Sequence, residues 1–269
     1  MRPRMRIAVA GATGRVGHHV ADVLAAGHEI VAMSRSSGVD VVTGEGLGEA
    51  LTRVECVIDT ACGPSPKREA ATERFIAAAR NLHAAGERAG VRRIVVMSIL
   101  GVDAATTGYG AAKLAHERAM LAGPIPVRVL RVALLHEFVG ELLEWGRQGD
   151  VCYLPKVCHH PVAARAVALA LAGLATDPAA LPASGSAGAP IAEIAGPQRE
   201  ALLDLGTRLA ARRGDPVRVE GVREQATPAR DLWETNAMLP GPDATLAGPT
   251  FQEWLDAMFW QGGADRVGA

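Results

Sequence analysis

The segment Ile7-Ala8-Val9-Ala10-Gly11-Ala12-Thr13-Gly14-Arg15-Val16-Gly17 decides the fold of this chain. A short apolar run leads into three glycines spaced G-x-x-G-x-x-G, and a helical pattern of valines and leucines follows. That order predicts a strand, a tight turn and a helix. Free N–H groups and the positive end of such a helix point at one spot, which suits a pyrophosphate.

Each glycine of this turn has a different expected task. Gly11 stands where the chain must turn sharply, Gly14 where a ligand can approach bare backbone, and Gly17 where the helix packs against the strand. We expect the neighbouring residues Thr13, Arg15 and Val16 to lie along the same ligand. The alternative is a tight turn that binds nothing.

A second strand is expected at residues 28–33, and it ends in Ser34-Arg35-Ser36-Ser37. In a dinucleotide-binding fold a carboxylate at this strand end binds the free ribose 2′-hydroxyl, whereas an arginine accommodates a 2′-phosphate. Arg35 holds the place of the carboxylate, and Arg15 could add a second guanidinium. We therefore predict NADP(H) as the cofactor, bound by Ser34, Arg35 and Ser36. The alternative is that Arg35 is a solvated loop residue.

The remainder of the chain continues to alternate between strand and helix as far as residue 133. Further strands are expected at 39–42, 56–61, 94–97, 127–132 and 191–195, the last at an edge, and helices at 47–51, 69–89, 109–121, 162–174, 202–213 and behind a capping box at Thr250 and Glu253. This pattern predicts an α/β protein with a doubly wound parallel Rossmann sheet. We assign residues 1–133 to the cofactor-binding core. Residues 134–269 would form a small C-terminal α/β substrate-binding lobe that interleaves with the core in a single compact unit, with an exposed connection at 177–190 and a disordered tail from 261.

Composition excludes several classes of function. The 269 residues carry a net charge of −1, so no basic surface is expected for nucleic acid. No apolar run reaches the roughly 18–20 residues that span a bilayer. We therefore expect a cytoplasmic protein that acts on a small molecule without nucleic acid or membrane, as a monomer or homodimer.

The cysteines suggest no metal site. There are four of them, and none forms C-x-x-C. Cys152 and Cys158 lie near His159 and His160, which leaves zinc as an alternative, but a second pair of ligands is lacking.

A set of polar residues near the expected strand ends could perform proton transfer. Tyr109 and Lys113 are four residues apart on an expected helix and share one face. The lysine ammonium favours the phenolate form of a nearby tyrosine and so brings it closer to use at neutral pH. Ser98 follows a buried strand and can donate a hydrogen bond to a substrate oxygen, while Thr60 and Ala61 end the neighbouring strand beside the cofactor. An isolated Y-x-x-x-K has a simpler alternative, a helix start with a solvated lysine.

Together G-A-T-G-R-V-G, Ser98 and Y-G-A-A-K resemble the short-chain dehydrogenase/reductase superfamily, in particular its atypical NmrA-like branch. The resemblance implies a Rossmann core with a small substrate lobe. It also implies that Tyr109 is the acid/base, that Lys113 holds the ribose and tunes Tyr109, and that Ser98 orients the carbonyl. The sequence departs from the family at residues 44–46, where Gly-Glu-Gly replaces an expected acidic residue.

These residues lead to one principal hypothesis and two rivals. The principal one is an NADPH-dependent reductase of a carbonyl or quinone on an apolar small molecule, such as a polyketide-type natural-product intermediate. Its substrate pocket would be lined by Ile99, Leu134, His136 and Phe138, and His136 could be a second proton donor or a structural histidine. The first rival is a non-catalytic redox sensor that binds NADP. The second is an epimerase or dehydratase with tightly bound NAD(P), which we rank last because the C-terminal part looks small for a nucleotide sugar.

Overall fold

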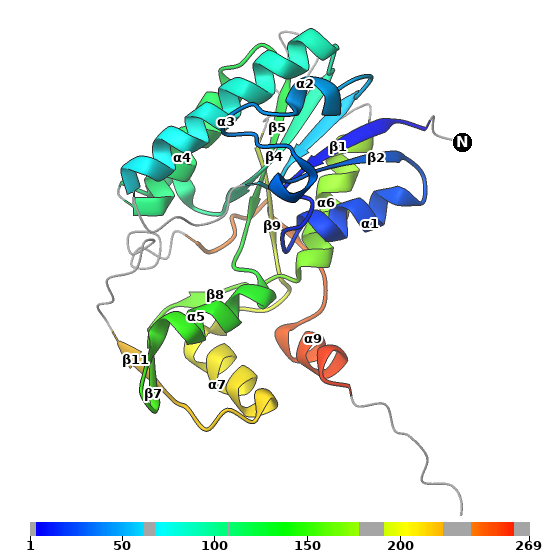
Figure 1. Ribbon diagram of the computed structural model, residues 1–269. Helices are drawn as coiled ribbons and strands as arrows, with labels where there is room; N and C mark the ends of the chain where they lie inside the picture. Colours follow the sequence, from blue (N-terminus) through cyan, green and yellow to red (C-terminus); the bar gives the residue numbers. More distant parts are fainter. Residues whose placement is uncertain (1–3, 62–67, 107, 178–190, 223–237, 261–269) are drawn as a thin grey trace, which may run out of the picture.

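A seven-stranded parallel sheet organises the chain in the computed structural model, which describes residues 4–61, 68–106, 108–177, 191–222 and 238–260 (Figure 1). The strand order is β12-β9-β5-β4-β3-β1-β2, and every neighbouring pair is parallel. The strands are β1 (Arg6–Ala10), β2 (Glu29–Met33), β3 (Cys56–Asp59), β4 (Arg93–Ile99), β5 (Val127–Val132), β9 (Ile191–Ala195) and β12 (Thr245–Leu246). The predicted connection at 177–190, apart from Asp177, and the predicted tail from 261 lie outside the described residues.

Helices cover both faces of this sheet, as the doubly wound prediction requires (Figure 1). One face packs against α1 (Gly17–Ala25) and α6 (Ala164–Thr176), and the other against α2 (Leu47–Ala50), α3 (Arg68–Ala89) and α4 (Gly108–Leu121). The central strands are buried on both faces, which is why they read as continuous apolar runs. The predicted α/β fold is therefore confirmed.

A smaller group of elements follows β5 and lies below the sheet in Figure 1. We call it the lobe. Its helices are α5 (Val139–Gly146), α7 (Leu202–Arg213) and α9 (Phe251–Met258), and its strands are β6 (Arg147–Gln148), β7 (Val151–Pro155), β8 (Cys158–His159), β10 (Glu200–Ala201) and β11 (Arg218–Val222). Phe251, Leu205 and Leu154 are among the buried residues of its own core. The predicted capping box is present, because Thr250 accepts a hydrogen bond from the Glu253 backbone and Glu253 accepts one from that of Thr250.

Two strand predictions need correction. Residues 39–42 form no strand, and residues 41–43 are a turn. Asp40 accepts hydrogen bonds from the backbone of Val42 and Thr43, and Asn81 donates to the carbonyls of Val41 and Val42. These side chains satisfy backbone groups that a sheet would otherwise pair. Strand β9 is not at the edge, since the two-residue strand β12 pairs beyond it.

Three short 3₁₀ turns follow strands of the sheet. Arg35–Ser37 follows β2, Val102–Ala104 follows β4, and His136–Phe138 follows β5. In the described residues no helix is both long and apolar enough to cross a membrane.

Candidate functional site

The carboxyl ends of four adjacent strands lie along one edge of the sheet. Because β4, β3, β1 and β2 are neighbours and parallel, Ser98, Thr60, Gly11 and Ser34 fall on the same edge. In open parallel sheets ligands bind outside this edge, at the point where the strand order reverses. Here the order reverses between β1 and β3, beside the glycine turn.

The structure separates the tasks of the three glycines. Gly11 has φ +77°, and a Cβ on it would lie 2.8 Å from the Ala61 Cα. A Cβ on Gly17 would lie 2.1 Å from the Gly11 oxygen, so both glycines are required by the packing of the chain itself. A Cβ on Gly14 would meet only the Gly11 oxygen, at 3.1 Å, and Gly14 is exposed together with Thr13 and Arg15. Gly14 is thus the position at which the turn presents bare backbone to the outside.

Helix α1 begins directly behind this turn without any side-chain cap. Its N-cap residue, Val16, is buried in the core, and no acidic residue lies in the first turn. The first N–H groups of a helix need an acceptor, and the helix dipole favours an anion there. The geometry therefore fits a pyrophosphate, as the sequence predicts.

Arg35 is exposed in the turn that follows β2. The Ser34 backbone donates to the Ser37 hydroxyl at 2.9 Å, and the hydroxyls of Ser34 and Ser36 are 2.9 Å apart. Within the described part of the chain Arg35 forms no ion pair that would compete with a ligand. A guanidinium among hydroxyl groups suits a phosphate.

Arg15 was expected to add a second guanidinium beside Arg35, but in the structure it points to the lobe. It forms an ion pair with Glu141 of α5, and its guanidinium carbon lies 5.5 Å from the centre of the Phe138 ring. Arg15 therefore connects the glycine turn to the lobe. This placement favours a role between the two parts of the protein over a role at a 2′-phosphate.

The residues that end β3 are engaged in local hydrogen bonds. The Thr60 hydroxyl donates to the Ala10 carbonyl at 2.7 Å, and the Ala61 backbone donates to Asp59 Oδ1 at 3.0 Å. Both residues lie against the glycine turn, since the Gly11 backbone approaches Ala61 closely. They shape the floor of the predicted cofactor site.

Ser98 presents a hydroxyl whose hydrogen-bonding capacity is unused. The residue is 3% exposed, and its Oγ has no partner among the described residues. Side chains alternate along a strand, so Ser98 lies on the same face as Val96 and Ile94, which pack under α3 and α4. A buried hydroxyl without a partner is rare and needs an explanation.

Tyr109 and Lys113 of α4 gather around the ring of Phe75 from α3. The rings of Tyr109 and Phe75 are 5.9 Å apart in an edge-on arrangement, and Lys113 Nζ lies 5.4 Å from the centre of the Phe75 ring. Lys113 is only 2% exposed. The alternative of a solvated lysine is therefore excluded. The two residues share a helix face over the sheet face that carries Ser98.

Two further residues of this cluster escaped the sequence analysis. Asp59 is 1% exposed, and its Oδ2 lies 3.3 Å from Nε2 of the fully buried His116. Burial alone would raise the pKa of Asp59, but its interaction with His116 and the charge of Lys113 outweigh burial and lower the pKa. An aspartate at the end of a buried strand and a histidine one turn after Lys113 were the available signals.

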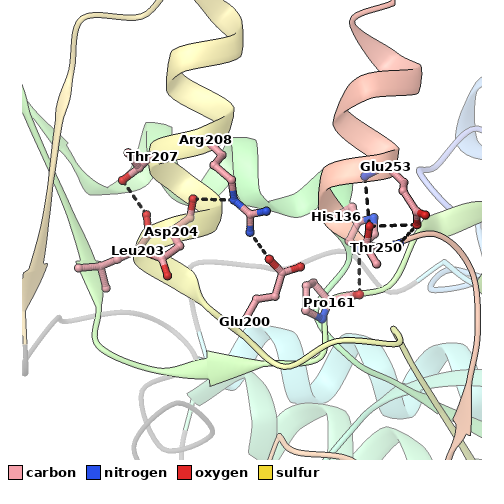
Figure 2. Close-up of polar contacts among 9 residues, drawn as sticks. All are labelled: His136, Pro161, Glu200, Leu203, Asp204, Thr207, Arg208, Thr250 and Glu253. Carbon is pink, nitrogen blue, oxygen red and sulfur yellow. Dashed lines mark hydrogen bonds and ion pairs between the residues drawn. The ribbon is translucent and has the colours of Figure 1, made fainter.

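The four predicted pocket residues differ in their burial and in the groups that they contact. Ile99 and Phe138 are partly buried against the lobe core, and Leu134 is part of it. His136 is fully buried, and its Nε2 donates to the Pro161 carbonyl at 2.8 Å (Figure 2). Its ring packs against those of Phe251 and Trp254. Burial lowers the pKa of His136 to about 4, against the opposing effect of that hydrogen bond. This placement favours a structural role for His136 over proton donation to a substrate.

Replacing His136 with glutamine should reduce the acid sensitivity of the fold. The folded protein resists protonation of His136 down to about pH 4, whereas the unfolded chain takes up this proton near pH 6.5. Its contribution is therefore complete above pH 6.5 and is lost as the pH falls to 4. In His136→Gln, whose amide can still donate to Pro161, urea unfolding between these limits should show about one proton fewer taken up on unfolding. An unchanged pH slope would contradict the assignment.

The four-ligand zinc alternative finds no support in the described residues, which contain no group of three or more His, Cys, Asp or Glu able to hold a metal ion. Cys158 and His159 form β8, which pairs with β10.

Comparisons with solved structures find the same fold in several proteins that were solved with NAD or NADP. MoeE5 in complex with UDP-glucose and NAD shares 20% identity at a TM-score of 0.67, over 95% of this chain and 97% of that one. A dTDP-4-dehydrorhamnose reductase from Bacillus anthracis in complex with NADP shares 14% at 0.66, over 96% and 99%. A short-chain dehydrogenase/reductase superfamily protein from Agrobacterium tumefaciens with bound NAD shares 19% at 0.59, over 86% and 96%.

These likenesses extend over nearly the whole of each chain and confirm the predicted superfamily resemblance at the level of the fold. No protein-family model matches the chain, and no curated protein matches its sequence.

Proposed function

We propose that this protein, with the fold of the short-chain dehydrogenases/reductases, is an NADPH-dependent oxidoreductase. Its substrate would be a carbonyl or quinone on an apolar small molecule, such as a polyketide-type intermediate, in the cytoplasm. The observation that carries this proposal is the buried Ser98 hydroxyl without a partner among the described residues, on the sheet face covered by the helix of Tyr109 and Lys113.

The residues divide the work of a reduction among themselves. The cofactor, when bound on the glycine turn, supplies a hydride. Ser98 donates a hydrogen bond to the substrate oxygen and so fixes its position, while the Tyr109 hydroxyl protonates that oxygen. Lys113 favours the phenolate that Tyr109 becomes, because an adjacent positive charge stabilises an anion. Buried placement of Lys113 strengthens this interaction, since water screens it less.

The direct test is cofactor oxidation by the purified protein. NADPH and NADH are each offered with a panel of quinones and apolar ketones, and absorbance at the nicotinamide band is followed. We expect NADPH oxidation with at least one of these substrates. Tight NADP binding without any turnover would favour the redox sensor instead.

A second candidate, an epimerase or dehydratase with tightly bound NAD(P), gains weight from one comparison. MoeE5 was solved with UDP-glucose and NAD, and this chain covers 97% of it. A chain of this size is therefore not too small for a nucleotide sugar, contrary to the reason for ranking that candidate last. Incubation with UDP-glucose and NAD, followed by NMR of the sugar, distinguishes the two: a changed C4 configuration or an oxidised sugar favours this candidate.

Replacing Arg35 with alanine should weaken the preference for the phosphorylated cofactor. A hydrogen bond to a charged group contributes about 1–3 kcal/mol, so the ratio of the NAD and NADP dissociation constants should fall by about 5- to 150-fold. Arg15→Ala should have a smaller effect, because Arg15 pairs with Glu141. Arg88→Ala, an exposed arginine in the last turn of α3, serves as the control. Equal or tighter binding of NAD by the parent would reject the NADP assignment.

A further inference from the structure

Three buried ionisable residues form a continuous chain behind the proposed site. Asp59 Oδ2 lies 3.3 Å from His116 Nε2, and His116 Nδ1 lies 3.4 Å from Lys113 Nζ. Asp59, His116 and Lys113 are 1%, 0% and 2% exposed. They come from the end of β3 and from one face of α4, so the chain joins the sheet to the helix that carries Tyr109.

The chemistry of the two outer groups fixes the protonation of the middle one. Among the described residues the Asp59 Oδ2 atom has no hydrogen bond of good geometry, but it lies 3.3 Å from His116 Nε2. An unprotonated Nε2 would set two acceptors against each other at this distance, so the carboxylate favours a hydrogen on Nε2. An ammonium can only donate, so His116 Nδ1 must be unprotonated toward Lys113. The resulting state is a neutral imidazole with its hydrogen on Nε2, between one negative and one positive charge.

We propose that Asp59 and His116 are positioning residues that hold the Lys113 ammonium in place for Tyr109 and for the cofactor ribose, an inference that rests on the proposed function. A lysine side chain loses rotamer entropy when it is held in one place, so a defined position requires partners. On one side the Phe75 ring faces the ammonium, and on the other His116 accepts from it. Asp59 acts through His116 by selecting its tautomer, because the hydrogen bond at one ring nitrogen decides the state of the other.

Replacing Asp59 with asparagine separates this role from packing. The side chain keeps its shape, and its oxygen can still accept from the Ala61 backbone as Oδ1 does now. The amide nitrogen then faces His116 Nε2 and favours an acceptor there, which moves the hydrogen to Nδ1. That N–H points at the Lys113 ammonium, so two donors oppose each other. An aspartate that orients a histidine acts by the same principle in hydrolytic triads.

Nitrogen-15 NMR of histidine-labelled protein reads this tautomer without any substrate. The chain has eight histidines, and the resonance lost in His116→Asn identifies the relevant one. We expect a neutral Nε2–H imidazole in the parent at pH 7 and a neutral Nδ1–H imidazole in Asp59→Asn. A parent His116 with hydrogen on Nδ1, whether neutral or doubly protonated, would overturn the proposal.

A matched pair of variants at residue 116 tests whether His116 positions the Lys113 ammonium. This pair tests the proposal even if Asp59→Asn does not fold. Asparagine and leucine have nearly the same shape, but only asparagine offers an acceptor near the position of Nδ1. Dissociation constants for NADP are measured in both variants. The constants kcat and KM are measured with any substrate that the cofactor-oxidation assay identifies. We expect His116→Leu to bind NADP about tenfold more weakly than His116→Asn and to lower kcat with little change in substrate KM. Equal affinities in the two variants would overturn the proposal.

The outcomes also separate this inference from the proposed function. A parent that binds NADP and shows the expected tautomer but reduces no substrate contradicts the reductase and leaves the positioning of Lys113 standing. A parent that binds no cofactor contradicts the proposed function, and the tautomer measurement then decides the inference.

Discussion

Replacing Tyr109 with phenylalanine should lower reductase turnover by about 10²–10⁴-fold, the usual contribution of general acid catalysis. The substitution removes one oxygen and keeps the ring that packs edge-on against Phe75. We therefore expect the melting temperature and the NADP dissociation constant to stay close to those of the parent. Steady-state rates, thermal unfolding and a cofactor titration measure the three quantities.

The chain offers a matched control for this variant, because Tyr153 is its other tyrosine. Tyr153 belongs to β7, and Figure 1 shows this strand at the lower end of the lobe, away from β1 and α1. Tyr153→Phe should retain parental turnover. If Tyr109→Phe keeps more than about half of the parental rate, Tyr109 is not the general acid, and catalysis then depends on placement of the cofactor and on water.

Replacing Gly14 with valine should abolish most of the cofactor affinity while the protein stays folded. A Cβ at this position meets only the Gly11 oxygen, at 3.1 Å, so the fold can adjust, but the branched side chain covers the exposed backbone that the pyrophosphate would approach. We expect a loss of at least about 100-fold in affinity, equivalent to about 2.8 kcal/mol. Calorimetric titration with NADP measures it.

Two other glycines provide the contrast. Gly17→Ala would place a methyl group 2.1 Å from the Gly11 oxygen and should lower the melting temperature, because that contact lies within the turn itself. Gly27 lies at the opposite end of α1, and a Cβ on it would have no atom within 4 Å. Gly27→Val should therefore leave the affinity for NADP unchanged. Normal NADP affinity in Gly14→Val would mean that the nucleotide lies elsewhere.

The fold was predictable because its signals are local and repeated. Apolar runs, glycine stops and helical spacing alternate through β1, α1, β2 and onward, and each local preference agrees with the same parallel sheet. The predicted strand at residues 39–42 was wrong, because the side chains of Asp40 and Asn81 form hydrogen bonds with backbone groups that a sheet would pair. The short strands of the lobe were not predicted, since two-residue pairings such as that of β8 with β10 leave no periodic pattern in the sequence.

The site was predictable only in part. Residue types and spacing along the chain indicated the glycine turn, Arg35, Ser98 and the Tyr109–Lys113 pair, because each lies within one element or directly after it. Contacts between residues of different helices and strands could not be predicted from the sequence. The ion pair that takes Arg15 to Glu141 joins residues 126 positions apart (141 − 15), and the burial of His136 depends on α9.

By itself the sequence determined the parallel α/β fold and the residues that meet at the carboxyl edge of its sheet, since both follow from the order of strand, turn and helix. Only the tertiary structure decided which side chains contact one another across that edge. Asp59 and His116 are 57 positions apart (116 − 59), and the chain carries no local sign that they would lie 3.3 Å from each other. Their contact arises from the packing of α4 on the sheet face that carries the end of β3. Burial there obliges charged groups to find partners that the linear chain does not specify.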